Sequence, residues 1–288
     1  MTRSIFELIT ALQRRGTRIN PEALKQGLTN PLKQDDPGHQ DKVEAQFAHL
    51  LTHLGPENRL HLTWKRALNA RWLCTPNVLH VRNPERVFLP EPDTTTLNVC
   101  LVRAEADFAL QMAGAPDEYV TGDLHSLVAE RTGLPRQETK IAFYEMLYGL
   151  DRHDPNVKAV SALLPEVVEY RNSIIRSVQA AGTRTPRRTL VLATHGNFGL
   201  FLQTALTEIN DRWLERIDLD LAFHYHDGAL LLVPQGSTEA ALTQRVTTAL
   251  RDTLGELCYA ETVPPTFRMH CDVERAPWGA EGRQSFLI

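Results

Sequence analysis

The chain has 288 residues, of which 42% are hydrophobic and 23% are charged, and its formal net charge is −4 at pH 7. This length allows one large domain or two small ones, and the composition excludes an intrinsically disordered chain. No apolar run approaches the roughly 20 residues that a membrane-spanning helix needs, and the four scattered cysteines lack metal-binding spacing, so we expect reduced thiols and a cytoplasmic protein.

The beginning of the chain predicts a helical region over residues 1–58. Apolar residues recur at helical spacing from Ile5 to Leu12, and Gly16 ends the pattern. An Asn-Pro pair then predicts the start of a second helix, and a third is expected over residues 41–54. The first segment lacks the apolar core and the cleavage site of a signal peptide. We expect no chemistry from this region.

Two basic segments follow, although the chain as a whole is acidic. They lie between residues 59 and 90 and after Gly182, and their cations are Arg59, Lys65, Arg66, Arg71, Arg82, Arg86, Arg184, Arg187 and Arg188. Proteins that bind nucleic acids usually carry a basic surface, so the net charge of −4 speaks against that class while these segments favour it. The other interpretation is that both segments are solvated surface.

The rest of the chain alternates between predicted strands and helices. Strands are expected over residues 60–64, 98–103, 188–194, 219–225, 229–234 and 266–273. Helices are expected over residues 104–113, 123–131, 136–150, 156–181, 198–214 and 238–254, with an interruption near Pro165. Since the strands flank a helical middle section, we predict an α+β fold with an antiparallel sheet.

The sequence His226-Asp227-Gly228 separates two apolar strands and predicts a tight hairpin. A carboxylate at such a tip is held rigidly and points to solvent, which suits a metal ion. An ordinary Asp-Gly turn has the same sequence. Because His224 alternates with His226, a transition-metal site is a further possibility, and with it an unrelated metal hydrolase.

Residues 136–150 carry two cations and two tyrosines at four-residue spacing: Arg136, Lys140, Tyr144 and Tyr148. Residues four apart lie on one face of a helix, so these side chains form a slowly winding stripe. Two fixed cations can grip a triphosphate, and an aromatic ring further along can stack on a base or sugar. The alternative is a solvated helix face with two aromatic residues that turn into the core.

Several motifs of this chain resemble motifs of the family A DNA polymerases and follow one another in the same order. The segment RQETKIAFYEMLYG is similar to the fingers helix of that family, and HDGALLLVP is similar to its palm hairpin. Shorter similarities are NARWLCTPNVLHV followed by RVFLP, the segment Asp123-Leu124-His125-Ser126, the pair His195-Gly196, and TFRMHCDVERAPW. The resemblance runs in collinear order from about Arg59 to Trp278.

The resemblance implies an architecture and a set of binding residues. It implies an antiparallel palm sheet over residues 59–288 with shortened helical fingers inserted at about 123–187, and a possible reduced thumb in residues 1–58. The implied nucleotide-binding residues are Arg136, Lys140, Tyr144, Tyr148, His125 and Glu105. Glu105 is expected to bond Tyr148 and to exclude a ribose 2′-hydroxyl. The implied DNA-binding residues are Arg71, Asn77 and Arg86.

The same resemblance implies damage to the catalytic residues. The family uses two Mg²⁺ ions bridged by carboxylates from two strands. Asp227 matches one carboxylate, whereas the other position holds Cys100, and Gly228 stands where the family has a Glu. His226 matches a residue beside the primer end. A thiol is a poor ligand for Mg²⁺, which prefers oxygen, so the two-ion site is expected to be weakened or lost.

Two functions follow from this pattern. The first is a pseudo-polymerase that binds primer–template DNA and/or dNTP and acts with a second protein subunit in DNA replication or repair. The second is an active minimal DNA-directed DNA polymerase with a non-standard second metal ligand, for example Asp107 or Glu105. Both place Asp227 opposite Cys100 and direct Arg136, Lys140 and Tyr144 toward it.

Overall fold

The main sheet in the computed structural model has five strands, and every neighbouring pair in it is antiparallel. The strands are β6 (Thr94–Val102), β7 (Asp220–Tyr225), β8 (Gly228–Pro234), β9 (His270–Arg275) and β10 (Arg283–Leu287). Their spatial order is β10-β9-β6-β8-β7. The structure describes residues 3–29, 36–67, 72–79, 81, 84–150, 153–180, 197–225, 227–260, 263–275 and 283–288. The predicted α+β class with an antiparallel sheet is confirmed.

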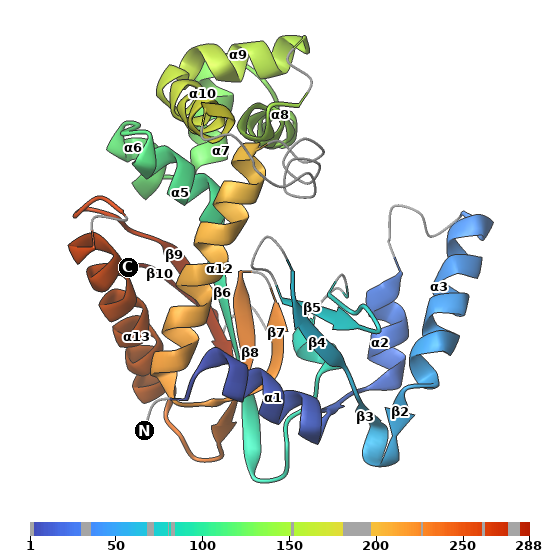
Figure 1. The fold of residues 1–288 in the computed structure, drawn as a ribbon. Coiled ribbons are helices and arrows are strands. Elements are labelled where there is room, and N and C mark those ends of the chain that lie inside the picture. Colours follow the sequence, from blue (N-terminus) through green and yellow to red (C-terminus); the bar gives the residue numbers. More distant parts are fainter. Residues whose placement is uncertain are drawn as a thin grey trace.

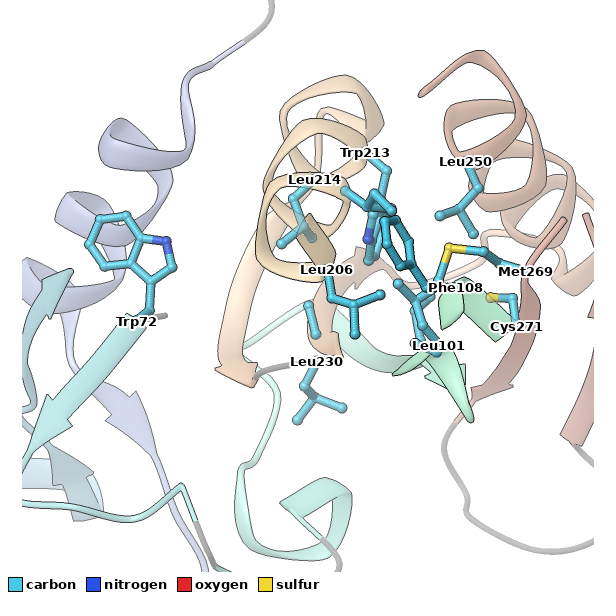
Figure 2. Close-up of a cluster of buried hydrophobic side chains, with 14 of the residues drawn as sticks. Trp72, Leu101, Phe108, Leu206, Trp213, Leu214, Leu230, Leu250, Met269 and Cys271 are labelled. Atoms are coloured by element: carbon cyan, nitrogen blue, oxygen red, sulfur yellow. The ribbon is translucent and has the colours of Figure 1, made fainter. Parts of the chain in front are cut away.

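Two long helices, α12 (Asn197–Ile217) and α13 (Glu239–Tyr259), run along this sheet (Figure 1). On β6 the side chains of Leu97, Val99 and Leu101 are buried, and they alternate with the partly exposed Asn98 and Cys100. Figure 2 shows Leu101 among core side chains of α12, α13, β9 and the residue before β9: Leu206, Trp213, Leu250, Cys271 and Met269. One face of the sheet therefore builds the core, and the other presents polar residues.

The helices that follow β6 and precede α12 in the sequence gather beyond one end of the sheet (Figure 1). They are α5 (Ala104–Met112), α6 (Asp117–Thr121), α7 (Leu124–Thr132), α8 (Arg136–Tyr148), α9 (Pro155–Leu163) and α10 (Pro165–Ala180). Asp123 and Asp154 cap α7 and α9 with side-chain hydrogen bonds, and Gly133 and Gly149 end α7 and α8 in the left-handed conformation. The predicted helices and the interruption near Pro165 are confirmed.

The N-terminal region is fastened to the edge of the main sheet. Helix α1 (Ile5–Arg15) begins with a capping box between Ser4 and Glu7. At its C-terminal end, Arg15 donates to the carbonyl of Leu221 on β7, and the hydroxyl of Thr17 donates to the carbonyl of Ala222 at 3.1 Å. Helix α1 thus covers the edge strand β7.

Small elements complete the N-terminal part of the chain. They are β1 (Thr17–Arg18), α2 (Pro21–Leu28), α3 (Pro37–Leu51), β2 (Leu54–Gly55), η2 (Pro56–Asn58), β3 (Arg59–Leu60), β4 (Thr63–Arg66), β5 (Trp72–Thr75) and α4 (Pro84–Val87). The predicted strand over 60–64 is divided between β3 and β4. The third helix begins four residues earlier than expected, because Asp36 caps it and a proline occupies its first turn.

The C-terminal strands also differ from the prediction. The strand expected over 266–273 is β9 at His270–Arg275, and β10 was not predicted. The predicted strand 188–194, the pair His195-Gly196 and the second basic segment lie outside the described residues. In the described ranges, no helix combines the length and apolar character that crossing a membrane requires.

Candidate active site

Asp227 lies at the tip of the β7–β8 hairpin, as the sequence predicts. Tyr225 pairs with Gly228 across the turn, and the side chain of Asp227 is exposed. The carbonyl oxygen of Asp227 accepts a hydrogen bond of 2.6 Å from the backbone amide of Leu101 on β6. The hairpin tip is therefore tied to the neighbouring strand. His226, the other turn residue, lies outside the described residues.

Cys100 lies on β6 between two strands that each bring a carboxylate close to it. It pairs with Gly228 of β8, next to Asp227, and with Asp272 of β9 on its other side. Burial, together with the charges of Asp227 and Asp272, raises the pKa of the Cys100 thiol to about 12. The predicted neighbourhood of Asp227 and Cys100 is confirmed, and the thiol is neutral at physiological pH.

Gly228 lies unusually close to the backbone of β6. A Cβ atom at this position would stand 2.1 Å from the carbonyl oxygen of Val99, 2.8 Å from the ring of Tyr225 and 3.0 Å from the Cα of Cys100. Real Cβ atoms do not approach backbone atoms this closely. Any side chain at position 228, a carboxylate included, would therefore force β6 and β8 apart.

Helices α7 and α8 bring the predicted phosphate-binding residues together. Arg136 and Lys140 are exposed on α8, and Arg136 forms an ion pair of 3.0 Å with Asp123. Burial, together with the positive charges of Lys140 and Arg136, lowers the pKa of His125 to about 4. The Nδ1 atom of His125 is buried without a hydrogen-bond partner. The ring therefore stays neutral near these two cations at physiological pH.

The two tyrosines of α8 both interact with Glu105 of α5. Tyr144 is half-buried, and burial followed by the charge of Glu105 raises the pKa of its phenol to about 12. The hydroxyl of Tyr148 donates a hydrogen bond to Oε2 of Glu105 on α5. This hydrogen bond between residues 43 positions apart is the one that the resemblance implies.

A cavity of about 480 Å³ lies between Cys100, Glu105, Tyr144 and Asp227. Its walls come from β6, α5, α8, α12 and the hairpin, and its lining residues are Leu79, Val81, Asn98, Cys100, Arg103, Ala104, Glu105, Tyr144, Gln203, Leu206, Phe223, Tyr225, Asp227 and Arg283. Tyr144 and Asp227 thus line one space, so α8 overlooks the hairpin. A cavity of this size matches a small-molecule site.

Asp107, which the sequence offered as a substitute metal ligand, is engaged elsewhere. It is fully buried, accepts a hydrogen bond of 2.6 Å from Nε of Arg103, and lies 2.7 Å from Nδ1 of His270 on β9. Arg103 also donates to the backbone carbonyls of Tyr119, Val120 and Gly122. This buried network joins α5 to β9 and to the turn after α6, so Asp107 cannot serve the cavity.

The histidine that suggested a transition-metal site is also part of the core. The ring of His224 is 1% exposed, and its Nε2 lies 3.4 Å from Nδ2 of Asn210 and 3.7 Å from Asp211. The same Nδ2 of Asn210 donates to the carbonyls of Tyr225 and Gly228 at 3.3 Å each. His224 and Asn210 therefore support the hairpin from inside, a role that the sequence does not reveal.

Two of the three predicted DNA-binding residues, Asn77 and Arg86, lie within the described part of the chain. Asn77 and Arg86 are exposed, and Oδ1 of Asn77 accepts a hydrogen bond of 3.1 Å from the backbone amide of Leu79, a residue of the cavity wall. Arg71 lies outside the described residues. Two further residues beside Cys100, Asp272 and Arg283, were not predicted, because nothing in their local sequence indicates which strand they pair with.

The residues at the hairpin do not fit a site for two magnesium ions. The position facing Asp227 holds a neutral thiol, and Mg²⁺ requires oxygen ligands. The position after Asp227 has no room for a side chain. In the part of the chain that the structure describes, no three His, Cys, Asp or Glu side chains are arranged to hold a metal ion.

No protein-family profile matches the chain, and no curated protein matches it. Among solved structures, the chain is similar to the POL domain of Pol1 from M. smegmatis in complex with DNA primer-template and dNTP, with a TM-score of 0.67 and 16% sequence identity. The similarity covers 89% of this chain and 55% of that one, so this chain spans about half the length of that structure. The chain has a polymerase-like fold.

Proposed function

We propose that the protein is a shortened and degenerate relative of the family A DNA polymerases that binds primer–template DNA and dNTP but has an impaired two-metal site. In this proposal it acts as a pseudo-polymerase with a second protein subunit in DNA replication or repair. The fold likeness to a polymerase domain in complex with DNA primer-template and dNTP supports the choice of ligands.

The observation that carries this proposal is the contact between Cys100 and Gly228 across β6 and β8. These two positions are where the resemblance implies carboxylates. One holds a thiol that stays protonated, and the other holds a glycine whose Cβ position is blocked by the Val99 carbonyl at 2.1 Å. Losing ligands of this kind removes the charge stabilisation that drives phosphoryl transfer.

The arrangement of the predicted binding residues also supports the proposal. Arg136, Lys140 and His125 cluster at the N-terminal half of α8, and Tyr148 is bonded to Glu105 beside the cavity. Cations supply most of the free energy of binding to phosphate, and an arginine fork adds directional hydrogen bonds. In free protein Arg136 is paired with Asp123, so a triphosphate would have to displace an exposed ion pair, which is worth only about 0–1 kcal/mol.

The division of labour follows the same correspondence. Residues 59–288 would form the palm, the helices at about 123–187 the fingers, and residues 1–58 a reduced thumb. Asn77, Arg86 and Arg71 would contact the duplex on the side of β5 and α4. His226 would lie beside the primer end, next to Asp227.

Primer extension in Mg²⁺ and in Mn²⁺, with wild type beside Asp227→Asn, tests the catalytic part of this proposal. We expect extension near background for both proteins, together with binding of primer–template in a fluorescence-anisotropy titration. Lys140→Ala should weaken dNTP binding about tenfold, because one direct phosphate contact of a cation is lost. Robust extension that Asp227→Asn abolishes would instead establish the alternative, an active minimal DNA polymerase.

A further inference from the structure

Arg283 lines the same cavity as Cys100 and Asp227, and its charge lowers the pKa of the Cys100 thiol against the larger effects that raise it. Resting on the proposed function, we infer that Arg283 replaces a metal ion in this cavity and binds a phosphate group directly. The ligand's chemistry is a phosphate of a nucleotide or of the DNA strand. The proposal predicts binding that needs no divalent cation.

Arg283 reaches the cavity because of the register of β10, β9 and β6. It pairs with Glu274 of β9, and Glu274 pairs with Asn98 of β6, another cavity residue. Paired residues in antiparallel strands point to the same face of the sheet. Arg283, Glu274 and Asn98 therefore lie in a row across the face that carries Cys100.

The guanidinium of Arg283 is held near its acids but is not tightly bonded to them. Its Nε lies 3.5 Å from Asp272 and 3.9 Å from Glu274, and its side chain is 54% exposed. Asp272 has a closer partner, since the hydroxyl of Ser285 donates to its Oδ1 at 2.6 Å. An incoming phosphate can therefore recruit Arg283 without leaving Asp272 unpaired.

Of the two arginines in the described cavity wall, Arg283 is the exposed one. The other arginine in the wall, Arg103, is 13% exposed and is fixed by Asp107 and three carbonyls. Glu105 is bonded to Tyr148. Within the described lining, Arg283 is thus the exposed cation, and its planar fork suits bidentate contact with phosphate.

The neutral thiol of Cys100 also favours phosphate binding in this cavity. A carboxylate there would repel a phosphate and would require a divalent ion between them, whereas a thiol adds no charge. The cavity lining thus combines the uncharged Cys100 with the positive charge of Arg283, beside the carboxylates of Asp227 and Glu105. Phosphate binding is then compatible with a site that does not support two-metal chemistry.

The test measures the affinity of the full chain for dNTP alone, for primer–template alone and for dNTP in the presence of primer–template, each in EDTA and in Mg²⁺. We expect the affinity to change less than threefold between the two buffers. Arg283→Gln should weaken it at least tenfold in both, and Arg283→Lys should weaken it less. The arm that loses affinity identifies the phosphate as that of the nucleotide or of the DNA.

The matched control is Arg245→Gln. Arg245 is also an exposed arginine with a loose ion pair, 45% exposed and 3.6 Å from Asp218, but it does not line the cavity. Its loss should change the affinity less than twofold. If Arg245→Gln and Arg283→Gln weaken binding equally, the effect is only one of net charge and the inference is wrong.

Asp227→Asn separates the two kinds of site. If Arg283 binds the phosphate, removing the negative charge of Asp227 should tighten binding in EDTA, because a like charge is removed. If a metal ion bridges Asp227 and the phosphate, the same variant should weaken binding, and wild-type binding should disappear in EDTA. That second pattern overturns the inference but leaves the proposed binding function intact. Absence of binding in every buffer overturns the proposed function itself.

Discussion

Gly228 and Cys100 pair directly across β8 and β6, so the two positions depend on each other. The backbone of β8 lies so close to β6 that the Cβ of any side chain at 228 would overlap the carbonyl of Val99. The backbone amide of Leu101, which follows Cys100, donates a hydrogen bond to the carbonyl of Asp227, which precedes Gly228. This bond holds the two strands close together. The geometry of the hairpin tip is thus adapted to the absence of a side chain.

This geometry predicts a large cost for a single methyl group. Gly228→Ala should lower the free energy of unfolding by more than about 2 kcal/mol, because overpacking against backbone displaces a strand. The matched control is Gly255→Ala on α13, where a Cβ meets nothing within 4 Å. That variant should gain about 0.5–1 kcal/mol from helix propensity. Urea denaturation of both variants gives the comparison, and equal effects would contradict the close approach.

His125 makes folding sensitive to acid. Its pKa is about 4 in the folded protein, through burial and the charges of Lys140 and Arg136, and lies near 6.5 in an unfolded chain. Between these values the unfolded chain binds a proton that the folded protein does not, so this contribution to stability is full above pH 6.5 and falls as the pH drops toward 4.

The expected loss through His125 is roughly 2–3 kcal/mol over that interval. In His125→Phe this part of the pH dependence should be absent, and the flanking rings of Phe143 and Tyr144 offer an apolar setting for the new side chain. Denaturation at pH 7 and at pH 4.5 measures the difference between wild type and variant. The same slope in both proteins would show that His125 does not titrate in this way.

At the scale of elements, the position of the helices α5 to α10 depends on the junction between β6 and α5. Arg103 is the N-cap residue of α5 at this junction and has the left-handed conformation, with φ of 49°. Its guanidinium donates hydrogen bonds to Asp107 and to the carbonyl of Gly122 after α6. His270 on β9 contacts the other oxygen of Asp107. The buried network thus links the sheet to the helices that carry the predicted phosphate-binding residues.

Removing Asp107 should therefore affect stability rather than metal binding. Asp107→Asn leaves Arg103 buried without its counter-charge, which costs about 3–5 kcal/mol. The measurement is the midpoint of denaturant unfolding, with Asp117→Asn as control, since Asp117 has an ion pair at the surface and its side chain is 69% exposed. An effect of Asp107→Asn below 1 kcal/mol would contradict the network.

The sequence predicted elements where one residue pattern decides the local structure. The four-residue spacing of α8 and the apolar runs beside Asp227 are patterns of that kind, and so is the helix break at Pro165. The resemblance predicted the bond between Tyr148 and Glu105. The positions of Asp272 and Arg283 relative to Cys100 were not predicted, because the pairing of β9 with β6 joins segments about 170 residues apart and depends on tertiary packing.

The start of α3 differs from the prediction for a local reason that the apolar pattern does not contain. The apolar pattern locates the interior of α3, whereas Asp36 and the following proline decide where it begins. The strand β10 alternates in exposure but has few apolar residues, so its sequence resembles a loop. It is a strand because the C-terminal segment pairs with β9 over five residues.

At the scale of the whole molecule, the N-terminal region and the main sheet form one packed unit. Helix α1 covers β7, and the backbone amide of Ile5 donates a hydrogen bond of 2.8 Å to Glu215 on α12. Ile5, Leu8, Ile9 and Leu12 are all at most 3% exposed, and they belong to the same buried cluster as the sheet and α12. A boundary near residue 58 is therefore not a boundary of the core.

This packing predicts that the two parts unfold together. Leu8→Ala on α1 should lower the free energy of unfolding by about 2–5 kcal/mol, because it leaves a cavity in the shared core. The fluorescence change and the far-ultraviolet circular dichroism of the variant should follow one transition, shifted as a whole. Two separate transitions, with only the first moved by the variant, would show that residues 1–58 form an independent domain.

The tight approach at Gly228 also constrains how this position can change. A single substitution cannot introduce a carboxylate here, since the strands would first have to move apart at Val99. Moving them apart brings no gain until the new side chain is present, and the new side chain is not tolerated until they have moved. Stepwise evolution toward a carboxylate at this hairpin position is therefore blocked by sterics in the backbone.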